Sequence, residues 1–141
     1  MNDRPTSVEL LAAARGFLEM ELIPTLTDAR LKFQTLVTAN VLAIVEREFQ
    51  TEESHLEAEC TELGKALLRS APMPERLSTL RQSVLESSRD LCDRIRRGEF
   101  DEPMRFSELA KQLRITVERK LEVANPRYLA TFGSNKGQGS T

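Results

Sequence analysis

The stretch from Asp28 to Phe49, DARLKFQTLVTANVLAIVEREF, decides the fold. It contains no glycine or proline, and its apolar side chains recur at intervals of three and four residues, the period of one helix face. At a rise of about 1.5 Å per residue the stretch spans roughly 33 Å, the height of a small domain. We therefore expect a long helix whose apolar face is the spine of the core. That face comprises Phe33, Leu36, Val37, Val41, Ile44 and Val45, and is widened by Ala39 and Ala43.

Four further segments show the same helical period. They run from Thr6 to Pro24, from about Glu52 to Ser70, from about Pro74 to Arg97, and from about Phe106 to Ala124. Thr6 and Glu9 have the spacing of a capping box, and Gly98 stands where a helix-ending glycine is expected. No segment alternates with the period of two that a half-buried strand requires. The sequence predicts an all-α fold, an antiparallel bundle of about five amphipathic helices.

The length of 141 residues fits a single domain. We expect this helical domain to cover residues 1–132. Residues 133–141 read GSNKGQGST. Such a segment has little apolar surface to offset the entropy of ordering, so a disordered tail is predicted there.

Composition narrows the classes of partner and compartment. The chain has a formal net charge of −2 and a pI near 5.6, which does not provide the positive surplus that nucleic-acid binding uses. Cys60 and Cys92 lie within helical patterns, as packed and reduced thiols of a cytosolic protein do. No apolar run approaches the ~18 residues of a membrane span, and no signal-peptide pattern follows Met1. A cytoplasmic protein that binds neither membrane nor nucleic acid is predicted.

No residue pattern in the chain is typical of a catalytic or metal-binding site. Glu52 and His55 have the Glu-x-x-His spacing of di-iron bundles, but those sites need a second such pair and the chain has one histidine. Cys60 lies five positions from His55, on another face of a helix, so a Cys–His catalytic pair is not expected. We predict no metal and no cofactor, and the sequence leaves open whether the protein is an enzyme.

Asn40 interrupts the apolar face of the Asp28–Phe49 helix. If this face is buried, the amide needs partners, because an unpaired buried amide costs ~1–3 kcal/mol. One interpretation is structural: the amide fixes helix register or bonds to the corner that follows the fifth helix. The other is functional: Asn40 is a polar group on the floor of a pocket between helices.

Charge is unevenly distributed along the chain. Residues 46–62 hold seven carboxylates and one arginine, whereas residues 105–120 hold five cations and two carboxylates. Either these groups pair with one another within the bundle, or they form a polarised surface that orients a protein partner or binds an anion.

Four stretches of the sequence resemble a known family. They are Arg4-Pro5, Glu9-Leu10-Leu11, the segment from Phe33 to Glu48, and Ala124-Asn125-Pro126-Arg127-Tyr128-Leu129. The chain resembles an uncharacterised bacterial family of small all-helical proteins, classed as a domain of unknown function, over most of Arg4 to Leu129. In that family a histidine commonly follows the phenylalanine, but Gln34 stands here, so chemistry that depends on that imidazole is not implied.

The resemblance implies a context rather than a reaction. Genes of the family often lie beside those for an aminoglycoside-phosphotransferase-like kinase and an acyl-CoA dehydrogenase, which implies acyl-CoA metabolism. It also singles out a candidate polar site of Asn40, Asn125, Arg127 and Tyr128. Our leading hypothesis is a non-catalytic accessory or regulatory protein that binds one of these neighbouring enzymes. The alternative is a small-molecule-binding protein or enzyme with a pocket near Asn40, and a homodimer is compatible with both.

Overall fold

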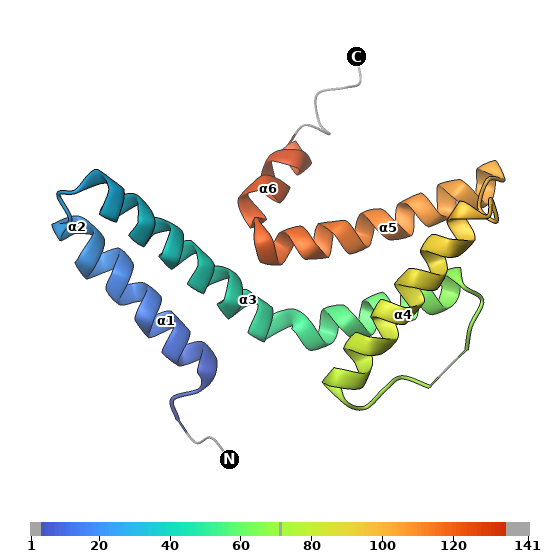
Figure 1. Ribbon diagram of the computed structural model, residues 1–141, viewed down its shortest axis with the longest axis horizontal. Helices are drawn as coiled ribbons and strands as arrows, with labels where there is room; N and C mark the ends of the chain where they lie inside the picture. Colours follow the sequence, from blue (N-terminus) through green and yellow to red (C-terminus); the bar gives the residue numbers. More distant parts are fainter. Residues whose placement is uncertain (1–3, 71, 135–141) are drawn as a thin grey trace. The chain divides into compact units, whose positions relative to one another are not determined.

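The computed structural model describes residues 4–70 and 72–134, with side chains as far as Thr131. Every regular element in this part of the chain is helical, so the all-α prediction is confirmed. The elements are α1 (Ser7–Phe17), η1 (Leu18–Leu22), α2 (Ile23–Thr25), α3 (Ala29–Ala66), α4 (Leu77–Arg96), α5 (Pro103–Ala124) and α6 (Pro126–Ser134) (Figure 1). Because α1, η1 and α2 follow one another without a break, the described residues form five helices.

The first helix begins as the sequence predicts and passes through one wider turn. The Thr6 hydroxyl accepts a hydrogen bond from the Glu9 N–H, and the Glu9 carboxylate accepts one from the Thr6 N–H, which is the expected capping box. Before Pro24 the helix changes to the π form of η1. Proline has no N–H to donate to the carbonyl four residues earlier, and a wider turn accommodates that loss. The helix then ends at Thr25.

The second and third predicted helices are one helix, so the predicted break near residue 50 is wrong. α3 runs without interruption from Ala29 to Ala66. Thr51, which directly precedes the predicted start at Glu52, donates its hydroxyl to the carbonyl of Arg47 one turn earlier, at 2.9 Å. A threonine that makes this bond lies inside a helix rather than at its start. The helix ends at Ala66, before the predicted Ser70.

The chain divides into two compact units, residues 1–51 and residues 52–141. In the first unit, α1 runs antiparallel to the first part of α3 (Figure 1). Arg15 of α1 donates to Glu46 of α3 at 3.1 Å, and Ile23 and Ala39 are the buried residues among those described in this unit. The single domain predicted for residues 1–132 stays a prediction.

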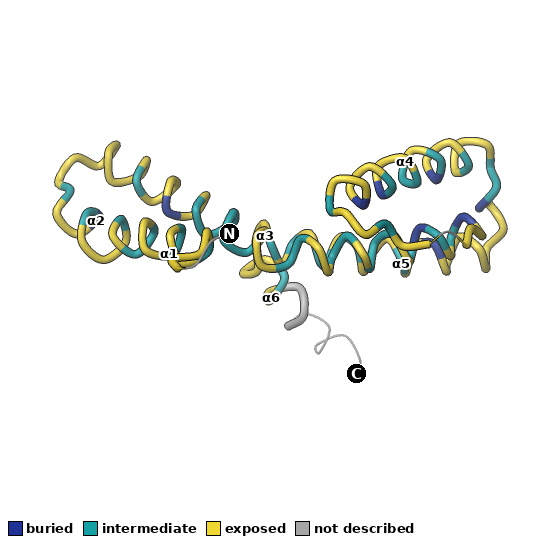
Figure 2. The backbone as a smooth tube through the Cα atoms, turned by 90° about the horizontal axis from the view of Figure 1, so that it is seen from below, coloured by how far each residue is buried: buried dark blue, intermediate teal, exposed yellow. Residues whose placement is uncertain are grey.

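The second unit contains the main apolar core. Figure 2 shows the buried positions along α4 and along the parts of α3 and α5 in this unit. The core cluster consists of Leu63, Leu67, Val84, Leu91, Phe100 and Leu109, with Leu56, Cys60 and Ala66 packed against it. Apolar burial of this kind is the principal stabilising contribution to such a unit.

α4 is followed by the predicted glycine, whereas α5 begins earlier than predicted. Gly98 follows α4 with φ 78°, at the position predicted for it. α5 begins at Pro103, three residues before the predicted start, because the Glu102 side chain caps it by accepting from two backbone N–H groups. α6 was not predicted, and it extends to Ser134, two residues into the predicted tail. The remainder of that predicted tail, residues 135–141, lies outside the described residues.

Candidate functional site

The structure places Asn40 on the surface of the first unit, so the predicted burial of this residue is wrong. The position that turns inward is its neighbour Ala39, which is only 2% exposed. The hydrogen bond expected between Asn40 and the corner after the fifth helix rested on that burial. The ~1–3 kcal/mol cost of an unpaired buried amide therefore does not apply to Asn40 within its unit.

Asn40 lies among apolar side chains that are exposed in the same way. We call these residues the α3 stripe: Phe33, Leu36, Val37 and Val41. They were expected to form the spine of the core, but each is exposed, whereas Thr35 and Glu46 on the opposite face are half-buried. Ile44 and Val45, further along the predicted face, are half-buried, so the outward position is confined to the part of the face from Phe33 to Val41. Complete burial of a Val, Leu or Phe side chain contributes about 1.5–3 kcal/mol, and these side chains, which are about half exposed or more, obtain only part of that contribution.

The other three candidate residues lie at the junction of α5 and α6. Asn125 is the C-cap of α5, and its side-chain oxygen accepts from the Tyr128 N–H at 3.2 Å. Pro126 occupies the first position of α6, where its missing N–H is not needed. Asn125 therefore ends one helix and starts the next, which is a structural role. Arg127 and Tyr128 are exposed.

The uneven charge of the sequence is largely used within each unit. Glu46 pairs with Arg15 at 3.1 Å in the first unit. In the second unit Glu52 pairs with Arg81 at 2.6 Å and Glu59 with Lys120 at 3.1 Å. Of these three ion pairs only Glu59–Lys120 joins the acidic and the basic regions of the sequence, so the first of our two interpretations applies to part of the charge.

The pair between Glu52 and Arg81 changes the pKa of the Glu52 carboxyl group. Arg81 donates to both oxygens of the Glu52 carboxylate, from Nε and Nη2, at 2.6 Å each. These hydrogen bonds lower the pKa of Glu52 below its ordinary value of 4.5, against the opposing effect of burial. The pair joins α3 to α4 at the start of the second unit.

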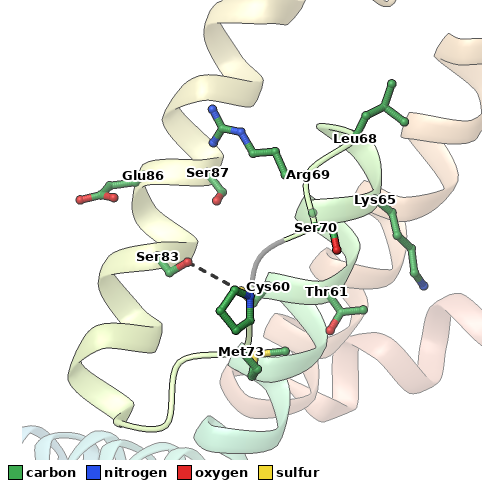
Figure 3. A pocket seen from close by; sticks show the side chains of 12 residues that line it. Cys60, Thr61, Lys65, Leu68, Arg69, Ser70, Met73, Ser83, Glu86 and Ser87 are labelled. Carbon is green, nitrogen blue, oxygen red and sulfur yellow. Dashed lines mark hydrogen bonds between the residues drawn. The ribbon is translucent and has the colours of Figure 1, made fainter.

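A pocket opens between α3, α4 and the segment that connects them (Figure 3). Its volume is about 790 Å³, within the range of small-molecule sites. Leu68 and Met73 supply apolar lining, while Cys60, Ser83 and Lys65 supply polar groups. The Cys60 sulfur lies 3.8 Å from the Ser83 hydroxyl. Asn40 does not line this pocket, and no pattern in the sequence predicts it, because its walls form only when α3 and α4 pack together.

The two cysteines are both free thiols, but only one is packed. Cys60 is half-buried against the core cluster, as predicted. Cys92 is exposed, so the prediction of a packed thiol is wrong for this residue. It lies on the outer face of α4 beside Leu85 and Arg96.

A second outward apolar row follows α5. We call these residues the α5 stripe: Phe106, Ala110, Leu113 and Val117. They recur at four, three and four positions, so they share one face of the helix. On the neighbouring face Gln112 and Thr116 are half-buried and line a small gap beside the core residue Leu109. Leu113 lines the same gap at the inner edge of the stripe, whereas Phe106, Ala110 and Val117 are exposed beyond it.

The remaining predictions on chemistry concern the histidine, metals and membranes. The His55 Nε2 atom lies 3.7 Å from a Glu122 carboxylate oxygen. Within residues 4–70 and 72–134, no three histidine, cysteine or carboxylate side chains gather in a way that could hold a metal ion. None of the described helices has both the length and the apolar character that crossing a membrane requires.

Comparison with known proteins gives a family and nothing more. No curated protein and no solved structure is detectably similar to this chain. A family model, described as a domain of unknown function, matches residues 24–128, which cover α3, α4, α5 and the start of α6. The chain belongs to this family, DUF6285.

Proposed function

We propose that this protein is a non-catalytic accessory protein that binds a partner protein through the α5 stripe. The observation that carries the proposal is the outward position of Phe106 and Val117 on a helix whose half-buried positions include Gln112 and Thr116. A single amphipathic face of this kind fits a groove or a helix of a partner, with an aromatic anchor near one end.

The charges beside the stripe favour a partner surface with carboxylates at its edge. Arg105 lies over the ring of Phe100, 5.2 Å from its centroid, and Lys111 lies 3.9 Å from Glu108. Both cations are exposed next to apolar positions of α5. At the rim of an interface such charges raise the association rate and suppress wrong partners rather than supply most of the affinity.

The resemblance noted from the sequence names the partners to test first. Within this proposal the partner is one of the two enzymes often encoded beside the family, the kinase-like protein or the acyl-CoA dehydrogenase, and the role belongs to acyl-CoA metabolism. The proposal places the protein in the cytoplasm, where free thiols stay reduced, and gives it no nucleic-acid partner. A homodimer is compatible with this role because it can use a different helix.

Co-purification tests the proposal. The full chain, carrying an affinity tag, is mixed with each purified neighbouring enzyme and recovered. We expect one enzyme to be retained by the wild-type chain and by Ile115→Asp, but not by Val117→Asp. Retention of neither enzyme, or equal retention by both variants, contradicts the proposal.

The pocket between α3 and α4 favours a second candidate function, the binding of a small amphipathic anion. Apolar Leu68 and Met73 lie in the same pocket as the cations Lys65 and Arg69. Anilinonaphthalene sulfonate, which has an apolar ring system and one negative charge, is a suitable probe. We expect its fluorescence to rise with the wild-type chain and its binding to slow the alkylation of Cys60. An unchanged alkylation rate at saturating probe contradicts this second function.

A further inference from the structure

We infer that the α3 stripe is the interface of an antiparallel homodimer, in which the α3 helices of two copies cross near Asn40. This inference goes beyond the proposed function, because it concerns another helix and another partner. It rests on three features of the first unit: the outward apolar row, the position of Asn40 within that row, and the charges at its edge.

The apolar row needs a cover that its own unit does not provide. Phe33 is 67% exposed, and Leu36, Val37 and Val41 are each about half exposed. α1 packs on the opposite face of α3, where Ala39 is buried and Arg15 bonds to Glu46. A row at positions i, i+3, i+4 and i+8 is the seam through which helices associate in pairs.

The charges at the edge of the α3 stripe favour a second copy of this chain as its binding partner. Arg30 and Glu48 are 18 positions apart, which is five complete turns, so both lie on the same edge of α3, the edge marked by Val41. In a pair of helices related by a two-fold axis and running in opposite directions, the same edges face each other. Arg30 of each copy then lies opposite Glu48 of the other, which gives two ion pairs per dimer. Both residues are exposed, and no ion pair within the described part of the chain uses either of them.

The same charges favour an antiparallel over a parallel arrangement of the two α3 helices. In a parallel dimer the two-fold axis runs along the helices, so the Arg30–Glu48 edge of one copy would face the other edge of its partner. The midpoint between Arg30 and Glu48 is position 39, next to Asn40. The axis of the antiparallel dimer therefore passes close to Asn40, and the two Asn40 amides come within reach of each other.

A paired amide at the centre of an apolar seam has a recognised effect. One polar residue at such a position sets register and orientation at a cost in affinity, because any other alignment leaves the amide unpaired. Asn40 thus has a role in choosing the partner rather than in stabilising the chain. We expect Asn40→Leu to tighten the dimer and to permit further oligomeric states.

The first test is the mass of the full chain in solution, measured by light scattering or sedimentation. With an interface smaller than the standard ~800 Å² per partner, the dimer should form over roughly 1–100 µM. We expect the mass to rise across this range toward about twice the 16.0 kDa of one chain. A mass that stays at one chain throughout overturns the inference, and means that the stripe is covered within the chain or by another protein.

Matched variants show whether the stripe is responsible. Phe33→Glu should abolish the dimer, whereas Phe49→Glu should leave it unchanged. The two phenylalanines are similarly exposed, at 67% and 61%, but point about 160° apart around α3. An unchanged helical circular dichroism signal establishes that each variant is folded. Equal effects of the two variants overturn the inference.

Charge exchange and cross-linking test the orientation. Arg30→Glu and Glu48→Arg should each weaken the dimer by roughly three- to tenfold, in the range of exposed ion pairs, and the double exchange should restore it. In a chain that also carries Cys60→Ser and Cys92→Ser, Asn40→Cys should form an intermolecular disulfide on oxidation, while Phe33→Cys should not. Efficient cross-linking of both variants indicates a parallel dimer and overturns the antiparallel assignment.

Discussion

Leu68 and Gly98 occupy the same position in two copies of one helix-ending turn. After α3 the Leu68 N–H donates to Lys65 O and the Arg69 N–H to Gly64 O, at 3.1 and 2.8 Å. After α4 the Gly98 and Glu99 N–H groups make the equivalent bonds to Ile95 and Arg94, at 3.0 and 3.1 Å. Both turns require a left-handed backbone, and the φ angles are 54° at Leu68 and 78° at Gly98.

We expect Leu68→Gly to stabilise the protein. A left-handed conformation costs an L residue about 1–2 kcal/mol, and glycine removes that cost while adding some entropy to the unfolded chain. The Leu68 side chain is 85% exposed, so little burial is lost. The net gain should be about 1 kcal/mol, or roughly 2–4 °C in Tm, measured by calorimetry.

The matched control is Gly98→Ala, which should have the opposite sign. Besides the unfavourable φ, a Cβ at position 98 would lie 2.8 Å from an Asp101 carboxylate oxygen. A decrease of about 1 kcal/mol or more in the free energy of unfolding is expected. If Leu68→Gly lowers the Tm, the leucine makes contacts that outweigh the backbone cost, and our interpretation of the turn is wrong.

The two thiols should differ in accessibility. Cys92 is exposed on α4, whereas Cys60 is half-buried against the core cluster. With a neutral alkylating reagent the native protein should react quickly at Cys92 and several-fold more slowly at Cys60, as peptide mass spectrometry can resolve. The difference should disappear in denaturant. Equal native rates would show that Cys60 is not packed as the structure has it.

Lowering the pH should decrease the free energy of unfolding, in part because protonation of Glu52 breaks its ion pair with Arg81. Because the pKa of Glu52 is lowered in the folded state, its contribution is fully present above the ordinary value of 4.5 and is lost as the pH falls through the lowered folded value. Arg81→Gln should therefore reduce the free energy of unfolding at pH 7 and have a smaller effect near pH 3. Denaturant titrations at the two pH values measure this. If Arg81→Gln lowers the free energy of unfolding by the same amount at both pH values, the Glu52–Arg81 pair does not cause the effect of acid.

Local signals correctly predicted the helix start at Thr6 and the helix end at Gly98. The capping box of Thr6 and Glu9 and the helix-ending Gly98 act through bonds to residues three to five positions away, so a single sequence contains the whole motif. The same kind of motif was missed at Asn125, where a residue that ends α5 also starts α6. Asparagine before proline is compatible with both roles, but the helical period alone predicts only the end of α5.

The direction of each apolar face could not be predicted from periodicity. The period of Phe33, Leu36 and Val41 identifies a helix face, but it does not say whether this chain or another molecule covers it. Asn40 was expected to be buried for that reason. In the structure the buried position of this part of α3 is Ala39, and Asn40 beside it is exposed. The pocket beside Cys60 depends on tertiary packing between α3 and α4 in the same way.

The most direct test of the account is a calorimetric titration of the purified full chain against each neighbouring enzyme. Val117 and Ile115 lie on different faces of α5 and are 53% and 43% exposed, so they form a matched pair. One enzyme should bind the wild-type chain and Ile115→Asp with similar Kd, while Val117→Asp should weaken binding by at least about tenfold, as expected for an anchor residue. If neither enzyme binds, or if both variants bind as the wild type does, the α5 stripe is not a partner-binding surface.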